Sequence, residues 1–128
     1  MSTRQIKTQY AYAKWLAGDG VSVAAHTLAT TSIIPIGSII KGVTLRAAVA
    51  AASSGSATVA VTVGGITASS AVAVAKLDTA GWVVNESGVE DVANVTTTNA
   101  AIGVTIGTAV FTGSVSDVDI IIEYVLVD

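Results

Sequence analysis

Cysteine is absent from the 128 residues of this chain. Its absence excludes a disulfide framework, a cysteine-ligated zinc site and thiol catalysis. A chain of this length is the size of one domain and buries enough surface to fold without cross-links. We therefore expect a single domain that is stabilised by an apolar core.

Aromatic and charged residues are also scarce. Aromatic residues make up 5% of the chain and charged residues 12%, whereas hydrophobic residues make up 52%. The apolar content is therefore mostly alanine, valine and isoleucine, which fill a thin core between sheets. Because a typical soluble domain carries about 25% charged residues, we expect part of the surface to be covered by neighbouring subunits.

No segment has the features of a membrane span or a signal peptide. The longest stretch without a charge, 47–75, is broken by serine and glycine pairs and does not indicate a spanning helix. The first twelve residues are polar and lack the apolar segment of a signal peptide. We therefore expect no membrane partner.

Charge is unevenly distributed along the chain. The net charge of −3 gives no reason to expect nucleic acid as a partner. All six basic residues lie in the first 76 positions, and eight of the nine acidic residues follow them. Two interpretations stay open: chance in a weakly charged chain, or a basic amino-terminal arm that docks on an acidic neighbour.

Hydrophobic alternation with a period of two dominates the sequence and predicts β-strands. Strands are expected at 5–14, 21–25, 28–34, 39–49, 58–63, 82–84, 101–111 and 117–126. Glycine and serine turns separate them at intervals that are typical of a sandwich or barrel. We therefore predict an all-β fold, an antiparallel β-sandwich of jelly-roll type. Residues 18–128 form this sandwich, and residues 1–17 form either an amino-terminal arm or its first strand.

The alternation also assigns faces and neighbours to the strands. Alternate residues of 58–63 and of 117–126 are expected to face the core. Strands 39–49 and 58–63 are expected to pair as a hairpin. The polar stretch 85–99 is expected to be a long surface loop.

Four segments have a more specific pattern. They are I-P-x-G-x-I-I-x-G-V-T-L at 34–45, T-V-x-V-x-V-G at 58–64, L-D-T-A-G at 77–81 and V-x-I-x-I-E-Y-V at 118–125. From about Ile33 to Val127 the chain thereby resembles a family of small β-sandwich virion proteins of tailed bacteriophages. The resemblance covers about three-quarters of the chain; residues 1–16 and, apart from 77–81, residues 66–94 lie outside its pattern.

This resemblance implies a structural function. Members of the family are capsid decoration proteins, head fibres or tail-associated components. The first expectation is a decoration, or cement, protein that is made in the host cytoplasm and lies on the capsid surface of the virion. It would bind the major capsid protein, stabilise the shell and assemble with itself as a homotrimer. The alternatives are a head fibre, tail or adaptor component, or a receptor- or glycan-binding module.

His26 is the only histidine and the first candidate for catalysis. It could form a dyad with Ser22 or Ser32, but a solvated histidine at a strand edge is the more common situation. The sequence contains no nucleophile elbow of the G-x-S-x-G type. The glycines of 103–107 do not form a phosphate-binding loop, because they lie within a strand pattern. We therefore expect no enzymatic activity, no catalytic residue and no cofactor.

Three acidic residues, Glu86, Glu90 and Asp91, lie within the predicted loop and could bind calcium. Their spacing does not match an EF-hand, and a solvated acidic loop is the simpler interpretation. We therefore predict no metal site.

Asp117 and Asp119 are two residues apart in a strand and so share one face. We expect them to pair with Arg46 or Lys41 across a sheet. Paired carboxylates of a glycosidase would instead need a deep cleft with aromatic sugar platforms, and aromatic residues are scarce.

The amino-terminal segment concentrates basic and aromatic side chains and contains no acid in its first 16 positions. Because aromatic residues dominate interface hot spots, it supplies the candidate capsid or subunit interface. That interface comprises Arg4, Lys7, Tyr10, Tyr12, Lys14 and Trp15. In the alternative interpretation, the segment is the first strand of the sandwich and its tyrosines lie in the core.

Overall fold

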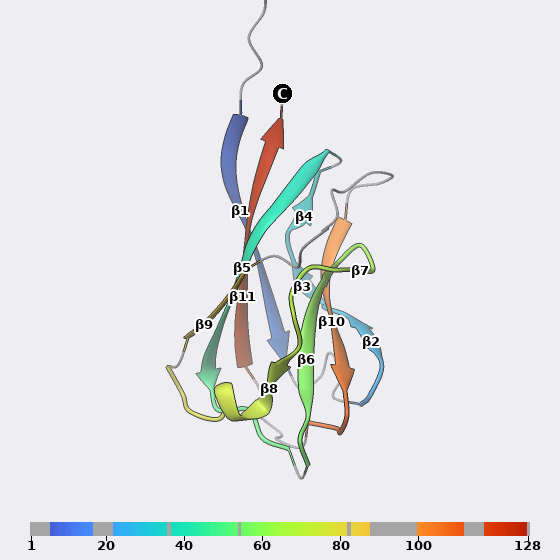
Figure 1. The fold of residues 1–128 in the computed structure, drawn as a ribbon, viewed down its shortest axis with the longest axis vertical. Coiled ribbons are helices and arrows are strands. Elements are labelled where there is room, and N and C mark those ends of the chain that lie inside the picture. Colours follow the sequence, from blue (N-terminus) through green and yellow to red (C-terminus); the bar gives the residue numbers. More distant parts are fainter. Residues whose placement is uncertain are drawn as a thin grey trace, which may run out of the picture.

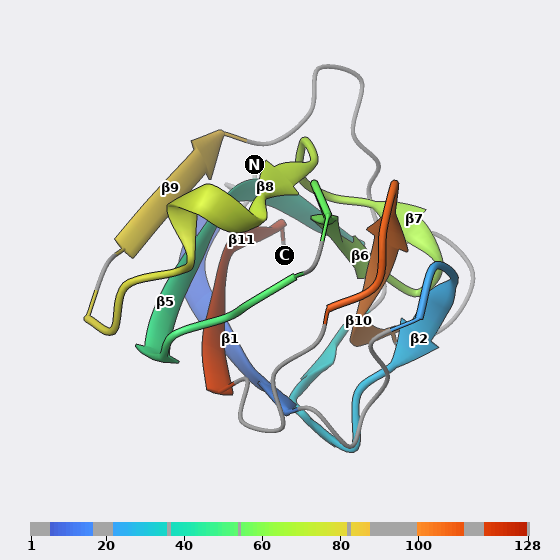
Figure 2. The ribbon, with the colours of Figure 1, turned by 90° about the horizontal axis from the view of Figure 1, so that it is seen from below.

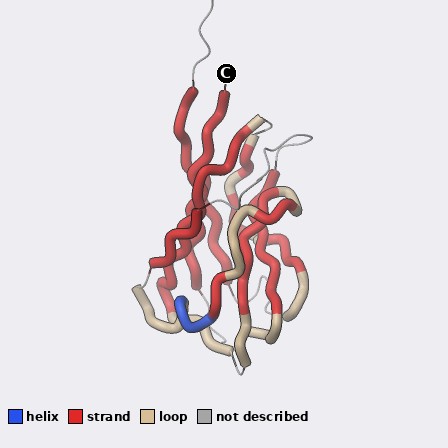
Figure 3. Tube along the Cα trace, in the orientation of Figure 1, coloured by secondary structure: helices blue, strands red, loops and turns tan. Residues whose placement is uncertain are grey.

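The computed structural model describes residues 6–16, 22–35, 37–53, 55–81, 83–87, 100–111 and 117–127. These residues form β-strands and one short 3-10 helix (Figure 3). The strands are β1 Ile6–Leu16, β2 Ala25–Thr27, β3 Thr30–Thr31, β4 Ile33–Ile34, β5 Ser38–Val49, β6 Thr58–Val63, β7 Ile66–Thr67, β8 Val72–Ala73, β9 Val83–Ser87, β10 Ala100–Gly107 and β11 Asp117–Val127, and the helix η2 is Val74–Lys76. Within these ranges no helix has the length and apolar character that crossing a membrane requires.

Two sheets lie face to face (Figures 1 and 2). The five-stranded sheet has the order β3-β1-β11-β5-β9, and the second sheet has the order β2-β10-β6-β7, with β4 beside β10 and β8 beside β6. Antiparallel pairs are nested along the chain: β1 with β11, β2 with β10, β5 with β9 and β6 with β7. This nesting is the connectivity of a jelly roll. The predicted antiparallel, jelly-roll sandwich is therefore confirmed.

The core fills the space between the sheets. Alternate residues of β6 and β11 face it, as predicted from the sequence; they are Val59, Val61, Val63, Val118, Ile120, Ile122 and Tyr124. Trp15 and Phe111 are the two largest fully buried side chains among the described residues. Their rings meet edge to face with centroids 4.8 Å apart, an arrangement that aromatic pairs prefer.

The predicted hairpin between 39–49 and 58–63 is wrong. β5 pairs with β11 and β9 in one sheet, whereas β6 pairs with β10, β7 and β8 in the other. The chain therefore crosses between the sheets after β5. The first three residues of the predicted loop 85–99 belong to β9 instead, and residues 88–99 lie outside the described part of the chain.

An irregularity in β5 changes which residues face the core. Ser38 and Ile40 are buried before it, and Val43 is the next buried residue after it. The register with β11 shifts at this point, so that Lys41 has no partner of its own there. This is the pattern of a β-bulge, which adds one residue to a strand, so that odd-numbered residues face the core after it where even-numbered residues did before it.

Candidate functional site

The outer face of the five-stranded sheet carries most of the exposed apolar side chains in the described part of the chain. Of the eleven large hydrophobic residues that are exposed there, seven lie on this face. We call this set the tyrosine face; it comprises Tyr10, Tyr12, Leu16, Ile39, Val49, Val83 and Ile121. For most of these residues the position follows from strand alternation, because their neighbours face the core. Val49 joins them through a register shift that sets it opposite Asp117.

β1 places its tyrosines and its tryptophan on opposite faces. Tyr10 is 68% exposed and Tyr12 41% exposed, whereas Ala11, Ala13 and Trp15 are buried between the sheets. The segment is thus the first strand of the sandwich, as the alternative interpretation had it, but its tyrosines lie outside the core. Trp15 was expected at the candidate interface, but its side chain is fully buried in the core.

An ionic network crosses the centre of this face. The hydroxyl of Tyr12 donates a hydrogen bond to Asp119 Oδ1 at 2.6 Å. Arg46 donates to Asp119 Oδ2 through Nε at 2.9 Å and through Nη2 at 2.6 Å. Lys14 Nζ lies 3.3 Å from Asp117 Oδ2. The predicted pairing of Arg46 is thus confirmed for Asp119, while Asp117 pairs with a lysine of β1.

These contacts fix the protonation of the network. The hydrogen bond from Tyr12 lowers the pKa of Asp119, and Arg46 acts in the same direction, against the effect of burial. The same hydrogen bond raises the pKa of the Tyr12 hydroxyl, to which burial and the negative charge of Asp119 add. At neutral pH the carboxylate is therefore ionised and the phenol protonated.

The other two basic residues of the candidate interface lie away from this network. Lys7 is exposed near the start of β1 and projects on the opposite side from Tyr10. Here the first half of β1 and the end of β11 run side by side beyond the second sheet (Figure 1). Arg4 lies outside the described residues. The structure thus brings Tyr10, Tyr12 and Lys14 together on one face.

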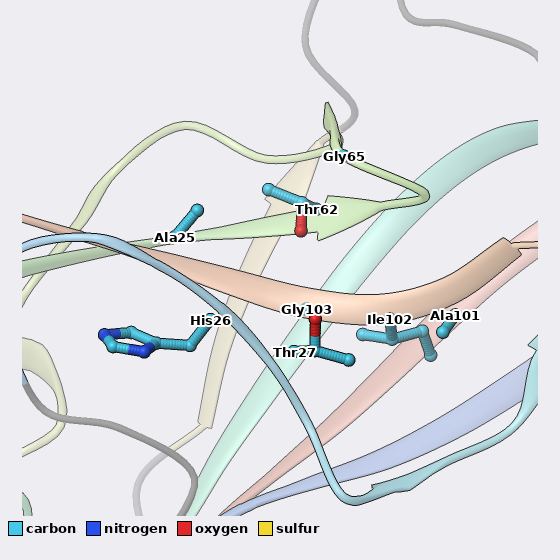
Figure 4. Close-up of a pocket in the computed structure, with 8 residues that line it drawn as sticks. All are labelled: Ala25, His26, Thr27, Thr62, Gly65, Ala101, Ile102 and Gly103. Atoms are coloured by element: carbon cyan, nitrogen blue, oxygen red, sulfur yellow. The ribbon is translucent and has the colours of Figure 1, made fainter.

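The second sheet carries a small hollow beside His26 (Figure 4). The cavity has a volume of about 150 Å³, and Thr62 and Gly103 contribute to its lining. The ring nitrogen Nε2 of His26 lies 2.8 Å from the main-chain oxygen of Ser22, not from its hydroxyl. The imidazole therefore contacts a carbonyl group rather than the nucleophile that a catalytic dyad with Ser22 would need.

Metal-ligating residues do not gather within the described ranges, where no three His, Cys, Asp or Glu side chains lie close enough to hold an ion. Of the three acids considered for calcium, Glu86 belongs to β9. Glu90 and Asp91 lie outside the described residues.

Five members of the tyrosine face were not predicted from the sequence: Leu16, Ile39, Val49, Val83 and Ile121. Ile121 could have been found, because it is an apolar residue on the strand face that otherwise holds Asp117, Asp119 and Glu123. Val83 joins the tyrosine face only through the pairing of β9 with β5, where it lies opposite Arg46. No local pattern indicates that pairing.

Comparison with known proteins identifies solved structures that share this fold. No protein-family description and no curated protein sequence matches the chain. A chain of the cyanophage Pam1 capsid asymmetric unit superposes with a TM-score of 0.63 at 23% identity, over 94% of this chain and 86% of that one. A chain of the acidic stable capsid structure of Helicobacter pylori bacteriophage KHP30 superposes with a TM-score of 0.55 at 14% identity, over 98% of each chain. At these identities the similarity establishes a common fold over nearly the whole length.

Proposed function

We propose that this chain is a structural protein of a bacteriophage virion and decorates the outer surface of the capsid. The observation that carries the proposal is the tyrosine face. Apolar side chains of this size, gathered on one face of a soluble domain, mark an interaction surface. The fold shared with chains from two phage capsids supports a capsid as the surface that it meets.

The tyrosine face has the composition of a docking surface for the major capsid protein. Tyr10 and Tyr12 supply flat aromatic area, and aromatic residues contribute most to interface hot spots. The charges of the central network are already paired, since Asp119 accepts hydrogen bonds from Tyr12 and Arg46 and Lys14 lies beside Asp117. A partner can therefore cover this network without leaving a buried charge unpaired, which would be costly.

Stabilisation of the shell follows from mass action. A decoration protein binds a site that exists in the assembled lattice and is absent from a free capsid subunit. Each occupied site then favours the assembled state by about 2.7 kcal/mol when the free protein is at 100 times its dissociation constant. Repetition over the lattice multiplies this effect.

A homotrimer is part of the proposal. The outer face of the second sheet carries small uncharged residues of β6, of which Thr58 and Ala60 are partly exposed and Thr62 is buried. Such a face suits close contact between copies around a closed cyclic axis. Light scattering of the purified protein tests this assembly, and a stable monomer at micromolar concentration would contradict it.

Binding to particles that lack the protein tests the docking surface. Ile121→Ser and Ile66→Ser make the same change at similar exposure, 39% and 42%, but on opposite sheets. We expect Ile121→Ser to weaken binding by about tenfold, which corresponds to about 1.4 kcal/mol. We expect Ile66→Ser to bind as the unchanged protein does. Equal affinities of the two variants would contradict docking through the tyrosine face.

Copy number distinguishes the proposed decoration protein from its alternatives. Decoration of a repeated lattice requires far more copies per particle than a tail or adaptor component, which forms one closed ring. Quantitative mass spectrometry of purified particles measures this ratio against the major capsid protein.

A further inference from the structure

β1 has one fully paired side and one largely open side. It pairs with β11 along its whole length. On the other side, Ala13 and Lys14 pair with β3, and Tyr12 is hydrogen-bonded to Ser32. Residues 6–11 pair with no described residue on this side. Among the described residues they form an unpaired sheet edge that is roughly 20 Å long at the usual rise per residue.

The main chain of this edge is directed outward at every second residue. The N–H of Ser32 donates to the carbonyl oxygen of Tyr12 at 2.8 Å, so the polar groups of Tyr12 face the open side. Successive residues of an antiparallel strand direct these groups to alternate sides. Thr8 and Tyr10 therefore also direct their N–H and C=O groups to the open side, with the spacing that another strand requires.

This edge lacks the usual protection against strand addition. Edge strands are commonly kept short, bulged or interrupted by proline. The second sheet follows this rule, because β2 has three residues and β7 has two. β1 has eleven residues, no proline and no register shift against β11. Lys7 is the only charged residue of the open segment.

We propose that the β1 edges of two copies of this chain pair antiparallel across a two-fold axis, with Gln9 opposite Gln9 of the partner subunit. Thr8 then lies opposite Tyr10 of the partner subunit, which is a favourable pairing of a β-branched and an aromatic residue. This register also separates the two Lys7 side chains by four residues, or roughly 13 Å. A shift that puts Thr8 opposite Thr8 of the partner subunit would bring the lysines into diagonal contact, at about 7–8 Å.

The pairing would join two five-stranded sheets into one continuous sheet. The two tyrosine faces would then lie on the same side of it, so that two neighbouring copies present one extended docking surface. The proposal does not rest on the proposed function, because the edge belongs to the chain itself. It is tested on purified protein with no particle present.

Single cysteines report the register, because the chain has none of its own. Gln9 of each copy would form a non-hydrogen-bonded pair with Cα atoms about 4.5 Å apart, within the range of a disulfide. Lys7→Cys is the matched control, on the same strand and face. We expect oxidised Gln9→Cys to run as a covalent dimer on a non-reducing gel and Lys7→Cys to stay monomeric.

A second pair of variants tests the main-chain hydrogen bonds. Thr8→Pro removes an N–H group on the open side and leaves the bonds to β11, since proline is tolerated on a strand edge that faces solvent. Thr8→Val keeps the N–H group. We expect Thr8→Pro to reduce the Gln9→Cys cross-link at least tenfold and Thr8→Val to preserve it.

Four results would overturn the proposal. The first is that Gln9→Cys forms no covalent dimer, which would mean that this edge does not pair with a second copy. The second is equal cross-linking of Lys7→Cys. The third is a mixed disulfide between Lys7→Cys and Gln9→Cys that exceeds the Gln9→Cys dimer, which would show another register. The fourth is a cross-link that persists with Thr8→Pro.

Discussion

At the scale of single residues, Asp119 connects the strands of the tyrosine face. It lies on the outer face of the sheet, yet only 7% of its surface is exposed. Tyr12 of β1 and Arg46 of β5 each hydrogen-bond to it, so that one carboxylate joins the two strands on either side of β11. Hydrogen bonds to a charged group are stronger than neutral ones.

The lowered pKa of Asp119 predicts a pH dependence of stability. A carboxylate whose pKa is lower in the folded state stabilises the fold above its ordinary pKa of about 4. This stability is lost as the pH falls through the folded value. We expect Asp119→Asn to cost about 1 kcal/mol at pH 7, because Arg46 is partly solvent-exposed. Urea unfolding should show that the unchanged protein loses more stability than this variant between about pH 5 and pH 2; parallel losses would argue against the network.

Two aromatic residues of β1 should differ sharply in their effect on stability. Trp15→Ala removes a fully buried ring that contacts Phe111, and we expect a loss of about 3–5 kcal/mol. Tyr10→Ala changes a side chain that is 68% exposed, and we expect a change within about 0.5 kcal/mol. Urea denaturation of both variants measures the difference. A stable Trp15→Ala variant would place the tryptophan outside the core.

At the scale of elements, β1 combines a structural role with a surface role. It lies between β3 and β11 and contributes three buried residues to the core through Ala11, Ala13 and Trp15. The other side of the same strand carries the two tyrosines of the proposed docking surface. Loss of the strand would therefore affect folding before it affects binding.

A shortened chain that begins at Gly18 tests this order. We expect it to lack a cooperative unfolding transition, because β11 loses β1, with which it pairs along its whole length. A chain that begins at Gln5 keeps β1 and serves as the control, with a transition like that of the full chain. Thermal unfolding followed by circular dichroism distinguishes them. A cooperative transition in the chain from Gly18 would mean that β1 is a dispensable arm.

The sequence predicted the faces of strands better than their partners. Alternation within β6 and β11 is local, so their buried residues could be assigned without knowing the neighbouring strands. Partner choice is not local, and β5 was paired with the next strand in sequence instead of with β11 and β9. Strands of two or three residues, such as β3 and β7, are too short to show a period.

The candidate site was predicted in part for the same reason. Tyr10, Tyr12 and Lys14 could be selected from composition, and they share a face. Trp15 was included because an aromatic residue gives no sign of which face it occupies until the core side of its strand is known. Ile121 and the rest of the tyrosine face come from strands distant in sequence, which only the sheet order brings together.

At the scale of the whole molecule, the jelly roll assigns different surfaces to its two sheets. The five-stranded sheet presents the tyrosine face and the open edge of β1, and the second sheet presents small uncharged residues. Nesting of the first and last strands places β1 and β11 side by side in the same sheet (Figure 2). The proposed contacts with the capsid and with a second copy therefore use neighbouring parts of one sheet.

Decoration of the capsid is tested by a reconstruction of the intact particle. We expect density for this jelly roll at repeated positions on the outer capsid surface. In that density the tyrosine face should lie against the major capsid protein, with Tyr10 and Ile121 within contact distance of it. Density confined to the tail or portal would contradict decoration, and a capsid-bound copy whose tyrosine face is turned to solvent would contradict the docking surface.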